Sequence, residues 1–158
     1  MSERKFLLVH GALALVAVVS AAPASATASL SCSIDDKSLK LEVTGIASHG
    51  FGEVLTNFDG TAEVRLRSVP DALKSLMLER SSVTQYWLDG PLFKLRLYSE
   101  TSGSPHSSVE IVIEARRYGR DETDYPGTYR LEFVSAGSGS GPSTTPVRAK
   151  GKVSCSVG

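Results

Sequence analysis

Two histidines, His49 and His106, are the side chains beyond residue 28 best suited to general-base catalysis or to binding a transition metal. A Ser–His–Asp site needs a nucleophile beside its histidine, and the sequence has no Gly-x-Ser-x-Gly motif to supply one. The two histidines lie far apart and do not form a zinc signature, and no glycine-rich phosphate-binding motif occurs. We therefore expect both histidines to be solvated residues of bends, and the sequence predicts no metal and no cofactor.

Carboxylates are the next candidates, because a pair of them can hydrolyse a glycosidic bond and a cluster of them can bind calcium. The acidic cluster at 121–124 lacks the spacing of an EF-hand and follows three arginines, which predicts a self-neutralised hairpin tip. Glu42, Glu63, Glu110 and Glu114 fall on the polar side of alternating segments, which predicts solvated positions on a sheet. A catalytic pair among such carboxylates remains an alternative, since its spacing is set in space and not along the chain.

The most distinctive stretch is 85–93, which contains the single tryptophan, Trp87, next to Tyr86. Neighbouring residues of a strand point to opposite faces, so one of these two rings must leave the core unless both faces are covered. An exposed ring near Asp89 and Tyr98 would offer a flat apolar platform beside polar groups, which suits a sugar or an extended peptide. Core packing is the alternative interpretation. Tyr86, Trp87, Asp89 and Tyr98 are the candidate ligand-binding residues.

The two cysteines, Cys32 and Cys155, lie near opposite ends of the predicted domain and belong to no Cys-x-x-Cys motif. In an oxidising compartment an even number of cysteines indicates disulfide bonds. We therefore predict a structural Cys32–Cys155 disulfide, with the first and last strands side by side or face to face. A redox or metal-binding pair is the functional alternative.

The N-terminal segment predicts an exported protein. Arg4 and Lys5 precede an apolar stretch at 6–19, and two small-x-small cleavage patterns end at Ala26 and Ala28. This order is typical of a bacterial Sec-type signal peptide, so we predict a signal peptide at 1–28, cleaved after Ala26 or Ala28, and a periplasmic or secreted domain at 29–158. The alternatives are a membrane anchor, for which the apolar stretch is too short, and a lipoprotein attached at Cys32. No membrane span is expected after cleavage.

The segments that must position these residues read as short strands. Apolar and polar residues alternate at 38–44, 61–67, 93–98, 109–116, 129–133 and 147–155, and more weakly at 30–34, 52–57 and 83–88. Asp59-Gly60 and Asp89-Gly90 are predicted turns, and loops are predicted at 101–108, 118–127 and 135–146. One short helix should begin at Pro70 and end by about residue 77. This pattern predicts an all-β fold, an antiparallel β-sandwich or small barrel of about 8 strands with one helical turn.

The balance of charge narrows the classes of function. Lysine and arginine number 17, as do aspartate and glutamate, and a neutral chain argues against a nucleic-acid-binding protein. With no supported catalytic constellation, the sequence favours a non-catalytic binding or interaction module whose partner is a protein, peptide or glycan in the periplasm. Two alternatives remain: an inhibitor of another secreted enzyme, and a hydrolase with a loop-borne carboxylate or histidine.

Overall fold

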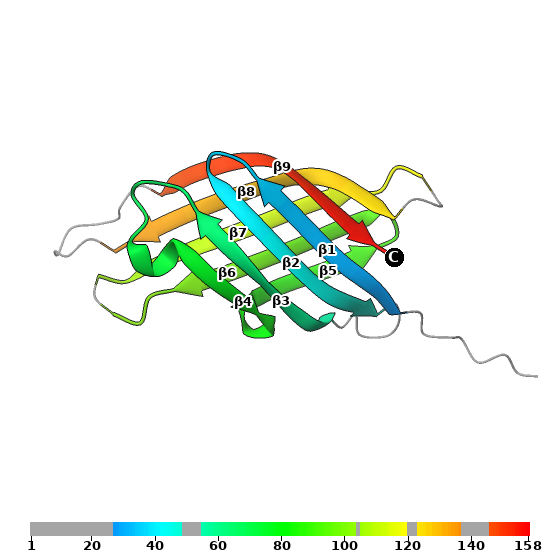
Figure 1. The fold of residues 1–158 in the computed structure, drawn as a ribbon, viewed down its shortest axis with the longest axis horizontal. Helices are drawn as coiled ribbons and strands as arrows, with labels where there is room; N and C mark the ends of the chain where they lie inside the picture. The colour runs from blue at the N-terminus through cyan, green and yellow to red at the C-terminus, as the bar shows by residue number, and fades with distance from the viewer. Residues whose placement is uncertain (1–26, 49–54, 104, 120–122, 137–145) are drawn as a thin grey trace, which may run out of the picture.

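The computed structural model describes residues 27–48, 55–103, 105–119, 123–136 and 146–158, which form an all-β fold of nine antiparallel strands (Figure 1). The strands are β1 (Thr27–Asp35), β2 (Leu39–Ser48), β3 (Leu55–Val64), β4 (Ser75–Glu79), β5 (Val83–Asp89), β6 (Leu92–Glu100), β7 (Ser107–Arg116), β8 (Asp124–Ser135) and β9 (Val147–Val157). Two single-turn 3₁₀ helices, η1 (Asp71–Leu73) and η2 (Arg80–Ser82), flank β4. The predicted all-β antiparallel class is confirmed.

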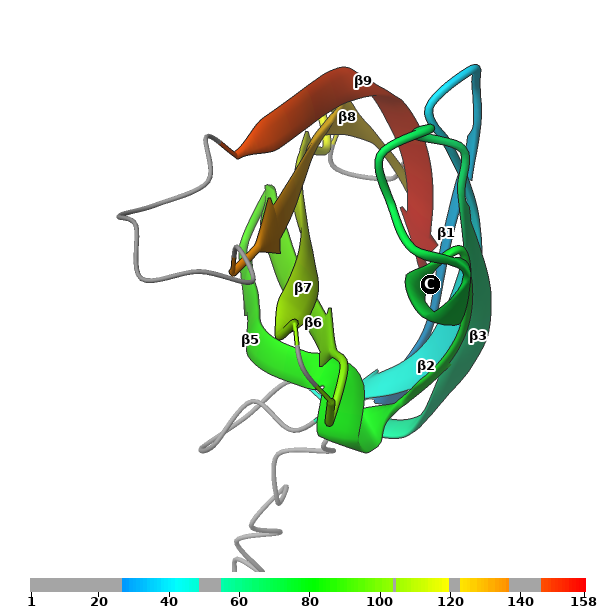
Figure 2. The same cartoon turned by 90° about the vertical axis from the view of Figure 1, so that its left-hand side faces the viewer.

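The strands form one sheet that curls into a nearly closed barrel. Its order is β4-β3-β2-β1-β9-β8-β7-β6-β5, so strands that are consecutive in sequence pair with each other except β4 and β5, and the first strand pairs with the last. The two edges, β4 and β5, are joined through η2. Seen from one end, the strands surround a common interior, with β1–β3 on one side and β5–β8 on the other (Figure 2).

Strand β9 bends from one side of the barrel to the other and connects the two. Its whole length pairs with β8, from Val147 opposite Phe133 to Ser156 opposite Asp124. Only its last residues, 154–157, also pair with β1. Figure 2 shows β9 arching from the β8 side to the β1 side. Strands that change sides in this way form the corners of orthogonally packed sheets.

The core lies inside the barrel and follows the predicted alternation. Every strand contributes its apolar face to one buried cluster, including Leu41 of β2, Leu95 of β6, Ile113 of β7 and Tyr129 of β8, each at most 1% exposed. The intervening residues face outward and are mostly charged or polar. The period-two pattern therefore assigned the buried faces of β2, β6, β7 and β8 correctly, because one face of each of these strands meets the core and the other meets water. In β9 only Val153 and Cys155 of the predicted face are buried, and Val147 is 37% exposed.

The predicted helical turn after Pro70 is present as η1 and ends at Leu73, because β4 begins at Ser75 and buries Leu76 and Leu78 while Met77 points outward. Two other local predictions are wrong. The predicted loop at 118–127 ends earlier than expected, because β8 already begins at Asp124.

The predicted Asp59-Gly60 turn lies in the middle of β3 and joins the two short strands expected at 52–57 and 61–67. Gly60 is required there by close packing and not by a turn: a Cβ on Gly60 would lie 2.3 Å from the Glu42 carbonyl oxygen and 2.7 Å from the Val43 Cα of β2. The other predicted turn, Asp89-Gly90, is correct, because β5 ends at Asp89 and β6 begins at Leu92.

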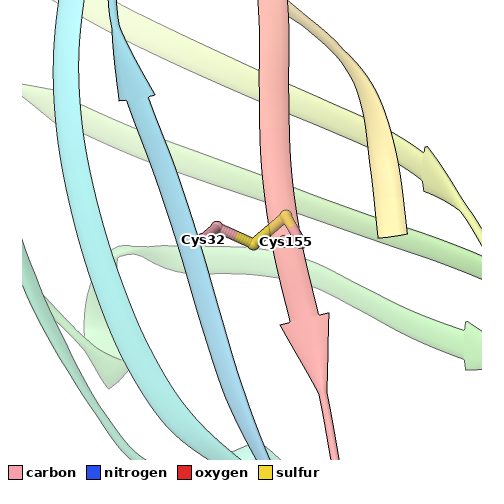
Figure 3. Close-up of a disulfide and its surroundings, with 2 residues drawn as sticks. All are labelled: Cys32 and Cys155. Carbon is pink, nitrogen blue, oxygen red and sulfur yellow. A yellow bond between two sulfur atoms is a disulfide. The ribbon is translucent and has the colours of Figure 1, made fainter. Parts of the chain in front are cut away.

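The predicted disulfide joins the first and last strands. Cys32 of β1 lies directly opposite Cys155 of β9, with a Cα–Cα distance of 4.0 Å, and both side chains are buried (Figure 3). The bond links residues 123 positions apart, and on the chain-entropy model such a loop stabilises the fold by about 4–5 kcal/mol. Of the two arrangements predicted from sequence, the strands adopt the side-by-side one.

A buried tyrosine ties the β1–β2 hairpin to the far side of the barrel. The hydroxyl of Tyr129 on β8 donates a 2.7 Å hydrogen bond to Oδ2 of Asp36 in the hairpin. Oδ1 of Asp36 accepts hydrogen bonds from the backbone N–H groups of Ser38 and Leu39. The Asp36 carboxylate and the Tyr129 ring both lie against Gly151 of β9. A Cβ at this position would lie 2.3 Å from Oδ2 of Asp36 and 2.6 Å from Cε1 of Tyr129. A side chain at residue 151 would therefore displace this contact.

We expect Tyr129→Phe to lower the free energy of unfolding by about 1.5–3 kcal/mol at pH 7, the range for a hydrogen bond to a charged group. Burial alone raises the pKa of Asp36, but the hydrogen bonds from Tyr129, Ser38 and Leu39 and the Arg65 charge outweigh it, so the pKa is lowered overall. This stabilisation is present above the unfolded pKa of about 3.9 and is lost as the pH falls through the folded value.

Urea denaturation between pH 2 and pH 7 measures both effects. The acid-induced loss should be smaller in Tyr129→Phe, because the folded pKa of Asp36 moves back toward its ordinary value. Tyr98→Phe is the matched control, since it removes a 2.7 Å bond from a hydroxyl to the exposed carboxylate of Glu100. Equal losses in the two variants would contradict the role assigned to the buried contact.

Candidate functional site

The structure separates the two neighbouring aromatic rings of β5. Tyr86 is half-buried and packs against the core, with its ring centroid 6.2 Å from that of Phe93 in an edge-to-face arrangement. Trp87 points outward and is 39% exposed. Nζ of Lys94, directly opposite on β6, lies 5.8 Å from the centre of the tryptophan ring, a cation–π contact. Trp87 therefore provides the outward ring and Tyr86 belongs to the core side.

The other two candidates lie on either side of Trp87 along the outer surface. Asp89 is exposed at the end of β5, two residues beyond Trp87. Tyr98 lies on β6, four residues beyond Lys94, and its hydroxyl donates to Glu100. Trp87 and Asp89 are thus brought together at the β5–β6 turn, whereas Tyr98 lies farther along the sheet.

A second exposed ring, which the sequence analysis did not select, lies on the far side of Lys94. Tyr118 follows β7 and is 80% exposed. Together with Leu92, Lys94, Glu114 and Pro126 it lines a depression of about 300 Å³, called here the aromatic groove. Lys94 contacts Trp87 and also lines this groove together with Tyr118, so both exposed rings lie near Lys94. The sequence offered one signal for this ring, because Tyr118 lies just beyond a predicted strand, at the start of the charged loop predicted at 118–127.

Cross-strand ion pairs cover the outward face of β6–β9. Lys94 Nζ lies 3.4 Å from Glu114, Arg96 Nε lies 2.8 Å from Glu110, and Arg148 Nε lies 2.7 Å from Glu132. Each pair joins two adjacent strands, which is the arrangement in which opposite charges stabilise a sheet. The face is therefore an ordered polar surface on which Glu110 and Glu114 are outward, as the alternation predicted.

A larger depression lies beside these pairs. It has a volume of about 810 Å³ and extends from outward residues of β7 and β8, past β9, to the tip of the β1–β2 hairpin. We call it the cationic groove, defined by Lys37, Val112, Arg130, Lys150 and the two carboxylates Glu110 and Glu132 that line it. Lys37 and Lys150 are exposed, and Val112 is half-buried on the groove wall.

The remaining candidates have less structural support. His49 and residues 121–122 lie outside the described residues, as do the predicted signal peptide up to residue 26 and positions 137–145 of the 135–146 loop. His106 is exposed and its Nε2 lies 3.5 Å from Glu100. Across the ranges that the structure describes, no three His, Cys, Asp or Glu side chains gather closely enough to bind a metal ion. Within the same ranges, no helix has the length and apolar character needed to cross a membrane.

Comparisons of the chain with protein-family models, with curated proteins and with solved structures gave no match.

The two rings of β5 should respond differently to truncation. Tyr86→Ala should lower the free energy of unfolding by about 3 kcal/mol, because it removes a large side chain that packs on the core. Trp87→Ala should cost less than about 1 kcal/mol, since its ring is exposed and contributes mainly one cation–π contact. Urea denaturation of the two variants checks this. A loss of 3 kcal/mol or more in Trp87→Ala would mean that its ring supports the fold rather than a ligand.

Proposed function

We propose that this protein is a non-catalytic binding module that recognises a glycan on the outward face of β5–β8. The observation that carries the proposal is the pair of exposed rings, Trp87 and Tyr118, beside the Lys94–Glu114 ion pair: Trp87 contacts Lys94, and Tyr118 lines a depression with Lys94 and Glu114. Aromatic rings combine a flat apolar face with a polar edge, and sugars present apolar C–H faces and hydroxyl groups. The aromatic rings can stack on the apolar C–H face of a sugar, and Lys94 and Glu114 can form hydrogen bonds with its hydroxyl groups.

The aromatic groove favours an elongated ligand over a compact one. It is a shallow depression on the outside of the sheet, whereas the interior of the barrel is filled by the apolar cluster of core side chains. A small molecule that needs to be enclosed would find no such enclosure on this face. A chain of sugar residues or an extended peptide can lie across the strands, and the two aromatic rings favour the sugar.

We also propose that the protein acts outside the cytoplasm. The buried Cys32–Cys155 disulfide supports this location, because such bonds persist in oxidising compartments. The basic, apolar and small-residue order at 1–28 supports the same location. A glycan-binding module in the periplasm or outside the cell would meet its ligand there.

Cleavage after Ala26 is expected in preference to cleavage after Ala28. Strand β1 begins at Thr27, which pairs with Ser48, and Ala28 is buried and pairs with Ala47. Removal of residues 27 and 28 would cost the sheet two paired positions. Intact-mass measurement of the exported protein should therefore give an N-terminus at Thr27. An uncleaved chain held in the membrane would contradict the proposed export.

One observation favours hydrolysis as a second candidate. Glu110 of β7 and Glu132 of β8 lie directly opposite each other and both line the cationic groove. Directly opposite residues have Cβ atoms about 4.5–5.5 Å apart, and retaining glycosidases hold their two carboxyl groups about 5 Å apart. Each of these carboxylates is already engaged by an arginine, Arg96 or Arg148, which makes a structural role the better explanation.

Affinity electrophoresis through gels containing soluble polysaccharides tests the main proposal. At least one polysaccharide should retard the protein, and Trp87→Ala and Tyr118→Ala should each reduce that retardation about tenfold or more, the scale of one lost stacking contact. Met77→Ala is the matched control, because Met77 is also 80% exposed but lies on β4, away from the groove.

Two results would overturn the proposal. The first is that no polysaccharide retards the protein. The second is that Met77→Ala reduces the retardation as much as the two aromatic variants do. Release of reducing ends from a retained polysaccharide, abolished by Glu110→Gln and by Glu132→Gln, would establish the hydrolase instead.

A further inference from the structure

Like charges face each other on the outward side of β8 and β9. Arg130 lies directly opposite Lys150, with Val112 of β7 on the other side of Arg130. Like charges at directly opposite positions destabilise a sheet. Among the described residues no carboxylate forms an ion pair with Arg130, Lys150 or Lys37. Three cations of the cationic groove therefore have no ion-pair partner within the part of the chain that the structure describes.

The acidic residues nearby do not offset this charge. Glu110 and Glu132 line the same groove, but each is paired with its own arginine, Arg96 and Arg148. The chain as a whole is neutral, with 17 basic and 17 acidic residues. The excess positive charge in the cationic groove is thus a local feature of this face and not a consequence of composition.

The cationic groove is continuous with the aromatic groove. Between them lies a third depression of about 300 Å³, which shares Lys94 and Glu114 with the aromatic groove. It shares Glu110, Val112 and Arg130 with the cationic groove. From Trp87 on β5 to Lys150 on β9 the path is roughly 20 Å, given a strand spacing of about 4.8 Å and a rise of about 3.3 Å per residue. An extended ligand can therefore contact both ends at once.

We propose that the ligand is an acidic polysaccharide, with sugar rings on Trp87 and Tyr118 and carboxylates on Arg130 and Lys150. This inference rests on the proposed glycan-binding function and specifies the class of glycan. A carboxylate between Arg130 and Lys150 would relieve their mutual repulsion, and a guanidinium can bind it through two parallel hydrogen bonds. The neutral net charge of the chain gives no long-range attraction to anionic polymers in general, so recognition depends on this local match.

Oligogalacturonate and its fully methyl-esterified form are the probes, because they share one sugar backbone and differ in charge. Calorimetric titration of the purified full chain should show the acid form binding about tenfold or more tightly than the ester, with a preference that falls as salt increases. Arg130→Gln and Lys150→Gln should each remove most of this preference, because each should weaken binding of the acid form more than binding of the ester. Both variants should melt at an equal or slightly higher temperature, since they relieve a like-charge pair.

Lys40→Gln is the matched control, because Lys40 is an exposed lysine of β2 on the other side of the barrel that forms no ion pair with any of the described residues. It removes the same charge and should leave the preference for the acid form intact. Equal binding of the acid and the ester would overturn the proposal, as would an equal effect of Lys40→Gln and Lys150→Gln. Binding of poly-glutamate or of phosphatidylglycerol vesicles in place of oligogalacturonate would overturn it in favour of an acidic peptide or an anionic lipid surface.

The same titrations separate this inference from the function on which it rests. If Trp87→Ala and Tyr118→Ala abolish binding of the ester and no preference for the acid exists, glycan binding stands and the acidic specificity fails. If the preference for the acid depends on Arg130 but neither aromatic variant changes any affinity, the aromatic platform fails and the carboxylate site stands.

Discussion

The pairing of β1 with β9 is the interaction on which the closed form of the sheet depends. All other strand pairs join neighbours in sequence, and each of those can form locally through a turn. The β1–β9 pair instead joins residues more than a hundred positions apart, and it extends over only four residue pairs. The disulfide between Cys32 and Cys155 lies within those four pairs. A covalent bond at this position fixes the register of the closing strands and keeps the apolar interior covered.

Closure of the sheet also determines where ligands can be recognised. The barrel interior is occupied by core side chains, and Tyr129 and Asp36 connect the β1–β2 hairpin to β8 at one end. The surface left for binding is the outward face, where residues from strands β5–β9 stand in rows. On a twisted sheet such rows form shallow grooves across the strands. The aromatic groove and the cationic groove are two parts of one such surface.

The arrangement of charge on that face separates structural from functional side chains. Ion pairs such as Lys94–Glu114 and Arg148–Glu132 follow the rule that opposite charges sit across from each other on adjacent strands. Two like-charge pairs on the same face depart from the rule: Glu110 opposite Glu132, each of which is paired with an arginine, and Arg130 opposite Lys150, which have no ion-pair partner among the described residues. Departures from the pattern that best stabilises a fold are expected at sites of function, because selection for binding acts there against selection for stability.

The sequence by itself determined the fold class, the buried faces of the clearly alternating strands such as β2, β6, β7 and β8, the disulfide partners and the outward direction of one ring of the Tyr86–Trp87 pair. These follow from period-two alternation and from cysteine number, which are local or countable properties. The tertiary structure decided which ring is outward, placed Tyr118 and Lys94 beside Trp87, and set Arg130 opposite Lys150. It also made Gly60 an interior strand residue rather than a turn residue. None of this could be read from the chain, because strand register and close backbone approach depend on residues that are distant in sequence.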